Sequence, residues 1–271
     1  MIPTPLANGF CFGEGPRWFE GMLWFSDMLG EAIHTVTLDG SMTTVALPGH
    51  APSGLGFRPD GSLLINSTQR REVLCYDGET VTTCAELAAL VPADLGDMVV
   101  DSRGGAYIGS QARDGGVIVR LGPDGAATVV ADDLEFPNGM VITPRGRLIV
   151  AESTARRLTS FEIDADGGLR DRRVFAEGLE GPPDGITLDS DGAIWVSMTL
   201  ACQFARITEG GTVTDRIDLG DRTAIACTLG GPERRVLFLL SSTDAYPQRL
   251  IGTKLSRLDT VTVAVPGAGR P

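Results

Sequence analysis

The stretch Asp-Gly-Ile-Thr-Leu-Asp-Ser-Asp-Gly at residues 184–192 is one copy of a frame that recurs along the chain. The frame returns at 53–61, 96–104 and 138–146, and in a version one residue shorter at 14–21. In each copy a short apolar run ends in a glycine turn, and a second apolar run follows. The turn glycines, which are Gly21, Gly61, Gly104, Gly146 and Gly192, lie 40, 43, 42 and 46 residues apart. Such near-constant spacing of strand patterns is typical of the blades of a β-propeller.

A sixth unit is marked by Gly230-Gly231-Pro232. Asp-Gly turns between apolar runs indicate hairpins, because glycine accepts the positive φ of a tight turn. We therefore predict an all-β, six-bladed β-propeller with four-stranded blades around a central metal site, formed as a single domain by residues 1–271. We expect residues 2–10 to pair with the last strands near 260–265 and so close the ring.

Charge and cysteine content limit the partners. The formal net charge of −12 argues against nucleic acid, because phosphate binding needs a basic face. There is no basic segment followed by an apolar run at the N-terminus, and no run of membrane-spanning length. The five cysteines are odd in number and scattered, which favours a reduced, cytoplasmic location. We expect a small-molecule substrate, no nucleic acid or membrane partner, and a monomer or dimer.

The residues at the predicted starts of the six inner strands carry the chemistry. They are Glu14, Ser53, Gly96, Asn138, Asp184 and Cys227. A propeller brings these starts together around one axis, so Glu14, Asn138 and Asp184 could supply oxygen ligands to one divalent cation. Ca²⁺ is the ion we expect, with Zn²⁺, Mn²⁺ or Mg²⁺ as alternatives. The competing interpretation is that Asn and Asp before glycine are ordinary turn residues.

Several motifs, in order along the chain, resemble the gluconolactonase, regucalcin (senescence marker protein) and luciferin-regenerating enzyme family. They are Phe12-Gly13-Glu14-Gly15-Pro16-Arg17-Trp18, Leu23-Trp24-Phe25-Ser26-Asp27, Pro137-Asn138-Gly139-Met140, Ala151-Glu152-Ser153, Pro183-Asp184-Gly185-Ile186 and Gly230-Gly231-Pro232. The resemblance implies a six-bladed propeller with one divalent metal on the axis and a lactone-hydrolysing activity. It places the metal ligands on Glu14, Asn138 and Asp184.

The third blade departs from that family. Sugar-lactone members carry an Arg, one further residue and then Asn-Asp-Gly, whereas this chain reads Asp94-Leu95-Gly96-Asp97-Met98. Only Asp97 matches. At Asp94 and Gly96, taken as substrate-binding positions, a sugar acid lactone therefore loses two expected polar contacts, those of the Arg and the Asn, which predicts a lactone less polar than a sugar acid lactone. Apolar residues expected near the mouth point the same way: Met28, Leu29, Leu95, Phe136, Met140, Met198 and Leu200. For Met140 and Met198, burial in the core is the alternative.

The expected mechanism is metal-assisted hydrolysis, in which the ion polarises the ester carbonyl and a water attacks. Asp184 and Asp97 are the two candidates for the proton acceptor. Nucleophilic catalysis by Ser53 or Cys227 would need His34 or His50 as its base, since no other histidine exists. Two alternatives stay open. One is a different reaction on the same metal propeller, such as organophosphate-type hydrolysis, hydration or isomerisation of a small apolar substrate. The other is a non-enzymatic calcium-binding protein.

Overall fold

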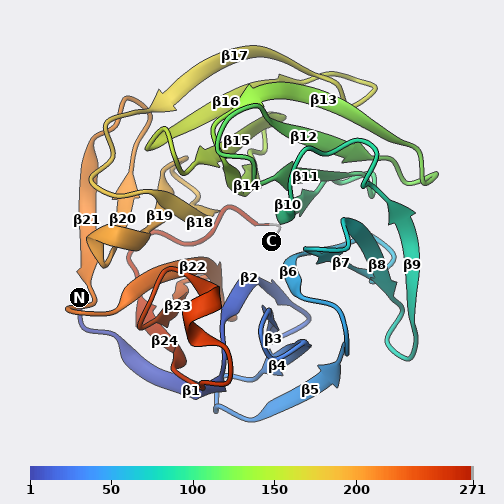
Figure 1. The fold of residues 1–271 in the computed structure, drawn as a ribbon. Coiled ribbons are helices and arrows are strands. Elements are labelled where there is room, and N and C mark those ends of the chain that lie inside the picture. The colour runs from blue at the N-terminus through green and yellow to red at the C-terminus, as the bar shows by residue number, and fades with distance from the viewer. Residues whose placement is uncertain (270–271) are drawn as a thin grey trace.

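Six four-stranded antiparallel sheets surround a central axis in the computed structural model, which describes residues 1–269 (Figure 1). The predicted six-bladed β-propeller is therefore confirmed. Apart from two short 3-10 helices, η1 (Thr199–Ala201) and η2 (Pro247–Leu250), the regular structure over those residues is strand. Across the same residues there is no helix with the length and apolar character needed to cross a membrane.

Five blades are continuous in sequence. Blade 1 contains β2 (Gly13–Phe19), β3 (Met22–Asp27), β4 (Ala32–Val36) and β5 (Met42–Ala46). Blade 2 contains β6 (Pro52–Phe57), β7 (Leu63–Ser67), β8 (Glu72–Tyr76) and β9 (Val81–Glu86). Blade 3 contains β10 (Leu95–Val100), β11 (Ala106–Ser110), β12 (Gly116–Leu121) and β13 (Ala127–Leu134). Blade 4 contains β14 (Pro137–Ile142), β15 (Arg147–Glu152), β16 (Arg157–Ile163) and β17 (Leu169–Ala176). Blade 5 contains β18 (Pro183–Leu188), β19 (Ile194–Met198), β20 (Gln203–Ile207) and β21 (Val213–Asp218).

The sixth blade joins the two ends of the chain. Its strands are β22 (Thr223–Gly230), β23 (Val236–Ser242), β24 (Ser256–Thr262) and, as the outer strand, β1 (Thr4–Phe10). β1 runs antiparallel to β24, with Thr4 opposite Thr260 and Phe10 opposite Ser256. The predicted ring closure by the N-terminal segment is confirmed, although the partner strand begins earlier than expected, at Ser256.

The first strand of each blade lines the axis, and these inner strands contact one another in ring order, with β22 against β2 completing the circle (Figure 1). In five of them the predicted axial residue stands second in the strand. The sixth expectation is wrong. β22 already begins at Thr223, so Cys227 lies in the middle of that strand rather than at its start.

In blades 1, 2, 4 and 5 a glycine follows the axial residue, because the next inner strand lies too close for a side chain. A Cβ on Gly139 would stand 2.4 Å from the carbonyl oxygen of Asp184 and 2.7 Å from the amide nitrogen of Ile186. The same kind of close approach occurs at Gly15, Gly54 and Gly185. All four glycines lie inside strands. The interpretation of Asn138-Gly139 and Asp184-Gly185 as hairpin turns is therefore wrong.

The hydrophobic core of residues 1–269 consists of six clusters, each between two neighbouring blades. Between blades 3 and 4, for example, Tyr107 and Ile118 pack with Leu148 and Phe161. The apolar side chains fill the spaces between blades, and the ends of the inner strands lie around the axis. Polar side chains at the axis are therefore carried by strands rather than by loops.

We expect Gly139→Ala to lower the free energy of unfolding by about 3 kcal/mol, because the added methyl group meets backbone atoms that cannot move aside cheaply. Urea unfolding followed by circular dichroism measures this change. Gly168→Ala is the matched control, since its Cβ would meet only ordinary contacts, at 3.6 and 3.7 Å; we expect a change within about 0.5 kcal/mol. Equal effects of the two substitutions would refute the close-approach argument.

Candidate functional site

The entrance face is the end of the axis at which the inner strands begin, and the exit face is the end at which they finish. Glu14, Ser53, Gly96, Asn138 and Asp184 all occupy the second position of an inner strand. Their strands run in the same direction around the axis, so all five lie at the entrance face. Residues separated by more than a hundred positions in sequence are thus collected at one place.

Asn138 and Asp184 are in direct contact across neighbouring blades. The Asn138 side-chain nitrogen donates a hydrogen bond of 2.5 Å to Oδ1 of Asp184. The same nitrogen lies 3.4 Å from Oγ of Ser153, whose hydroxyl donates to the carbonyl of Pro183 at 2.6 Å. Asn138 and Asp184 are 7% and 8% exposed. This network fixes both side chains in orientation.

Asp97 adds another buried carboxylate to the group. It is 5% exposed, and its Oδ1 has no hydrogen-bond partner among residues 1–269. It occupies the place in the third repeat where the second, fourth and fifth repeats have glycine. Arg17, also buried, donates to the carbonyl oxygens of Pro16 (2.7 Å) and Met98, and its charge acts on Asp97.

Burial and mutual repulsion make these carboxyl groups hard to ionise together. Burial, and then the charges of Asp184 and Asp97, hold the pKa of Glu14 well above its usual range. Burial, and then Asp97, also raise the pKa of Asp184 well above its usual range, against the hydrogen bond from Asn138. Burial raises the pKa of Asp97, which the Arg17 charge partly opposes. These effects show that Glu14, Asp97 and Asp184 lie close enough to interact strongly.

The chemistry of this group fits a bound cation. Within residues 1–269 no set of three or more His, Cys, Asp or Glu side chains is arranged to hold a metal by itself. The candidate set has two carboxylates, Glu14 and Asp184, and the amide of Asn138, an oxygen-only donor set that suits hard divalent ions. The unpartnered oxygen of Asp97 and the crowding of buried carboxylates are both features that a cation would relieve.

The third blade differs from expectation in one respect. A Cβ on Gly96 would stand 2.5 Å from the side-chain nitrogen of Gln111 and 2.8 Å from two of its carbons. The Gln111 nitrogen also lies 3.4 Å from the side-chain oxygen of Asn138. The space left by Gly96 is thus filled by an amide from the loop after β11, which the sequence analysis missed.

Asp94 is half exposed, and Arg71 stands 3.5 Å from its carboxylate, so the negative charge of Asp94 is partly balanced.

The apolar mouth is smaller than the sequence indicates. Met198 and Leu95 are fully buried in core clusters, and Met140 is 2% exposed in another. Placing Met140 and Met198 at the mouth was therefore wrong, and the core alternative holds. Met28 and Leu29 are half-buried against the cluster between blades 6 and 1. Leu200, on η1 at the entrance face, is 58% exposed.

The residues proposed for nucleophilic catalysis are not assembled for it. The Ser53 hydroxyl donates to the carbonyl of Gly96 at 2.9 Å, and burial raises the pKa of Cys227 to about 12. His50 lies 3.1 Å from Oγ of Ser67 and 3.2 Å from Glu72. His34 lies 2.9 Å from the Thr44 hydroxyl. Each histidine thus has partners of its own, which favours water as the nucleophile.

Comparison with known proteins agrees with this geometry. Residues 12–243 match the family described as the SMP-30/gluconolactonase/LRE-like region. The chain is 29% identical to the pentonolactonase XacC of Haloferax volcanii over 253 residues, covering 89% of this chain and 86% of that protein. It is also 29% identical to a 6-deoxy-6-sulfogluconolactonase of Pseudomonas putida over 273 residues, covering 96% and 94%.

A solved structure shares the fold along the whole ring. A calcium-binding protein, regucalcin, from Agrobacterium tumefaciens superimposes with a TM-score of 0.81 at 23% identity, covering 99% of this chain and 97% of that one. The family match spans most of the chain and includes Glu14, Asn138 and Asp184. The protein therefore belongs to the SMP-30/gluconolactonase/LRE-like family, in which relatives of similar length are named as lactonases.

Proposed function

We propose that this protein is a lactonase that depends on one divalent metal ion held by Glu14, Asn138 and Asp184. The observation that supports the proposal is the direct contact of Asn138 with Asp184 at the entrance face, beside the half-buried Glu14 and the buried Asp97, whose charges act on one another. Family membership and the two lactonase relatives support the reaction class. The regucalcin name supports calcium as the ion.

The donor set also fits the proposed ion. The amide oxygen and nitrogen of Asn138 can exchange places by a half-turn of the side chain, which would set its oxygen beside Oδ1 of Asp184. When bound, such an ion would polarise the ester carbonyl and offset charge on the tetrahedral oxyanion. The positive charge of the ion would favour the ionised forms of Glu14 and Asp184, whose pKa values are raised by burial and by neighbouring carboxylates.

Asp97 is the better candidate for the proton acceptor. Its Oδ1 is buried and unpartnered within the described chain, whereas Oδ1 of Asp184 already accepts a bond from Asn138. A general base needs a free oxygen within reach of the attacking water. Burial raises the pKa of Asp97, and the charge of Arg17 favours its ionised form. We assign Asp184 to ligation and Asp97 to proton transfer.

The substrate is proposed to be a lactone less polar than a sugar acid lactone. Gly96 contributes no side chain, and the polar group in its place is the single amide of Gln111. Asp94 is drawn toward Arg71. The unpaired cysteines of residues 1–269 are in keeping with the reduced, cytoplasmic location proposed for the protein. A different reaction on the same site remains the second outcome of the experiments below.

Glu14→Gln should weaken metal binding without lowering the stability of the metal-free protein. In chelator, the variant should be at least as stable as the parent, because it removes one of the buried, repelling carboxylates. With Ca²⁺ at a hundredfold excess over Kd, the parent should gain about 2.7 kcal/mol in free energy of unfolding and the variant much less. Thermal melts with and without metal measure both effects. Equal stabilisation of parent and variant by metal would exclude Glu14 as a ligand.

Asp97→Asn should separate chemistry from metal binding. We expect kcat for a lactone to fall by about 10²- to 10⁴-fold, because the proton acceptor is lost, while calcium affinity by calorimetry stays close to that of the parent. The control is Asp132→Asn, on an exposed part of β13, which should leave both quantities unchanged. Full activity in Asp97→Asn would move the role of base to Asp184. Calcium binding without turnover of any lactone, in the parent itself, would instead support another reaction or a calcium-binding role.

Gln111 should influence which lactones are accepted. On a panel of sugar lactones and alkyl γ- and δ-lactones, the parent should favour the alkyl compounds in kcat/KM. Gln111→Ala should strengthen that preference by about tenfold, since it removes the amide that could bind a substrate hydroxyl. Arg113→Ala, an exposed neighbour on the same loop, is the control. If the parent protein preferred sugar lactones, the proposed substrate class would be wrong, but the proposed metal site would not be affected.

A further inference from the structure

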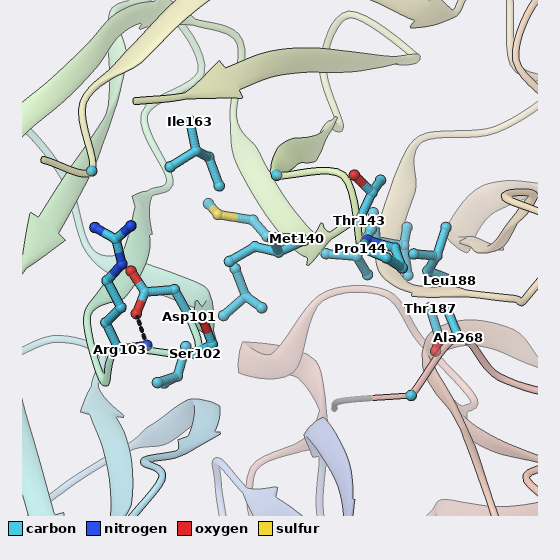
Figure 2. Close-up of a pocket in the computed structure, with 18 of the residues that line it drawn as sticks. Asp101, Ser102, Arg103, Met140, Thr143, Pro144, Ile163, Thr187, Leu188 and Ala268 are labelled. Carbon is cyan, nitrogen blue, oxygen red and sulfur yellow. Dashed lines mark hydrogen bonds between the residues drawn. The ribbon is translucent and has the colours of Figure 1, made fainter. Parts of the chain in front are cut away.

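A large cavity lies at the exit face, away from the candidate site. Figure 2 shows side chains that line it. It has a volume of about 660 Å³ and reaches the last residues of three inner strands, Val100, Ile142 and Leu188. Gly96, Asn138 and Asp184 stand at the opposite ends of those same strands. Six-residue strands are roughly 17 Å long, so the cavity and the candidate site are separate places on the axis. Cavities of this size are typical of small-molecule sites.

The end of the chain helps to enclose this cavity. The C-terminal segment returns to the centre of the ring (Figure 1). It is held there by hydrogen bonds from the amide of Gly267 to the carbonyl of Arg234 (2.8 Å) and from the amide of Ala268 to that of Leu188 (3.1 Å). Ala268 and Gly269 form part of the cavity wall. The cavity is thus a built pocket rather than an open funnel between blades.

The cavity wall carries both apolar side chains and hydroxyl groups. Met140, Ile163 and Leu188 supply apolar surface, and Ser102, Thr143 and Thr187 supply hydroxyls (Figure 2). An occupant with a hydrocarbon part and a polar head would find partners for both in such a wall.

The charges in the wall favour an anion. Both lining carboxylates already have partners. Asp101 accepts from the amides of Arg103 and Gly105 at 2.8 and 2.9 Å, and Asp164 accepts from Arg170 at 2.6 Å. The lining guanidinium groups are less fully satisfied.

Among the ion pairs of residues 1–269 none includes Arg234, whose guanidinium lies beside Gly269, and the Arg103 side chain donates to the carbonyl of Ala165 instead of to a carboxylate. Arg17 also lines the cavity, and its buried Nε has no partner in the same part of the chain. An excess of arginine in one pocket of a protein with a net charge of −12 is not explained by solubility.

We propose that the exit-face cavity is a second small-molecule site, which binds a carboxylate attached to an apolar chain or ring. Arg234 would bind the carboxylate, because a guanidinium group matches its geometry and holds its charge at any physiological pH. The apolar side chains of the wall would cover the hydrocarbon part. This proposal does not depend on the lactonase assignment, since it rests neither on the proposed metal ligands nor on Asp97.

The test uses octanoate, with octanol and octylamine as probes of equal chain length and different charge. Calorimetry on the full chain should show saturable binding of octanoate, about tenfold tighter than the binding of octanol or of octylamine. Amide resonances of Ser102, Thr143 and Ala268 should shift, and those of Gly96 and Gln111 should not. Arg234→Gln should weaken octanoate binding by about tenfold.

Arg235→Gln is the matched control. Arg235 is the sequence neighbour of Arg234 but does not line the cavity, so octanoate affinity should be unchanged. Melting curves identify any variant that fails to fold, and the probe series on the parent protein tests the proposal without any variant. Four results would each overturn the proposal. They are an affinity for octanol equal to that for octanoate, resonance shifts confined to the entrance face, an unchanged octanoate affinity in Arg234→Gln, and no binding at millimolar octanoate.

Discussion

The close approach of neighbouring inner strands at the axis is the constraint on which the rest of this structure depends. At Gly139 the next strand lies so near that even a methyl group would meet backbone atoms at 2.4 Å. Glycine is therefore required at that position for packing, while the residue before it is free to carry a functional group into the axis. One dipeptide, repeated around the ring, thus serves both the fold and the site. This explains why Asn138 and Asp184 meet across two blades with no loop to place them.

The same constraint concentrates negative charge. The ring collects Glu14, Asp97 and Asp184 at one end of the axis, where burial raises the pKa of each; the charges of Asp97 and Asp184 add to the rise at Glu14, and that of Asp97 to the rise at Asp184. A fold that kept these three carboxyl groups for stability alone would gain from replacing them with neutral side chains. A cationic ligand would offset the cost of keeping these carboxyl groups close together. The acids are therefore better explained by ligand binding than by packing. Arg17 offsets only part of the charge, through Asp97.

Much of this could be predicted from the repeat. Their equivalent positions in the repeats identify Glu14, Asn138 and Asp184, because a propeller brings equivalent positions of successive repeats close together around its axis. Gln111 was missed because its role depends on the empty volume above Gly96, which spacing does not reveal. Met140 was misplaced because the pairing of β14 with β15 shifts register between Pro137 and Met140, so simple alternation along the strand fails. Cys227 was misplaced because the sixth repeat lacks the frame of the others, and β22 starts four residues earlier.

The two ends of the axis differ in charge, and that difference bears on the proposed reaction. Opening a lactone converts a neutral ester into a carboxylate, so product and substrate differ by one negative charge. At the entrance face, the proposed ion and Asp97 would act on the neutral ester. An alkyl lactone would yield a carboxylate with an apolar chain, which is the class of ligand that the exit-face cavity is built to accept. The acidic entrance and the arginine-lined exit are thus suited to opposite sides of one chemical conversion, on a single rigid ring.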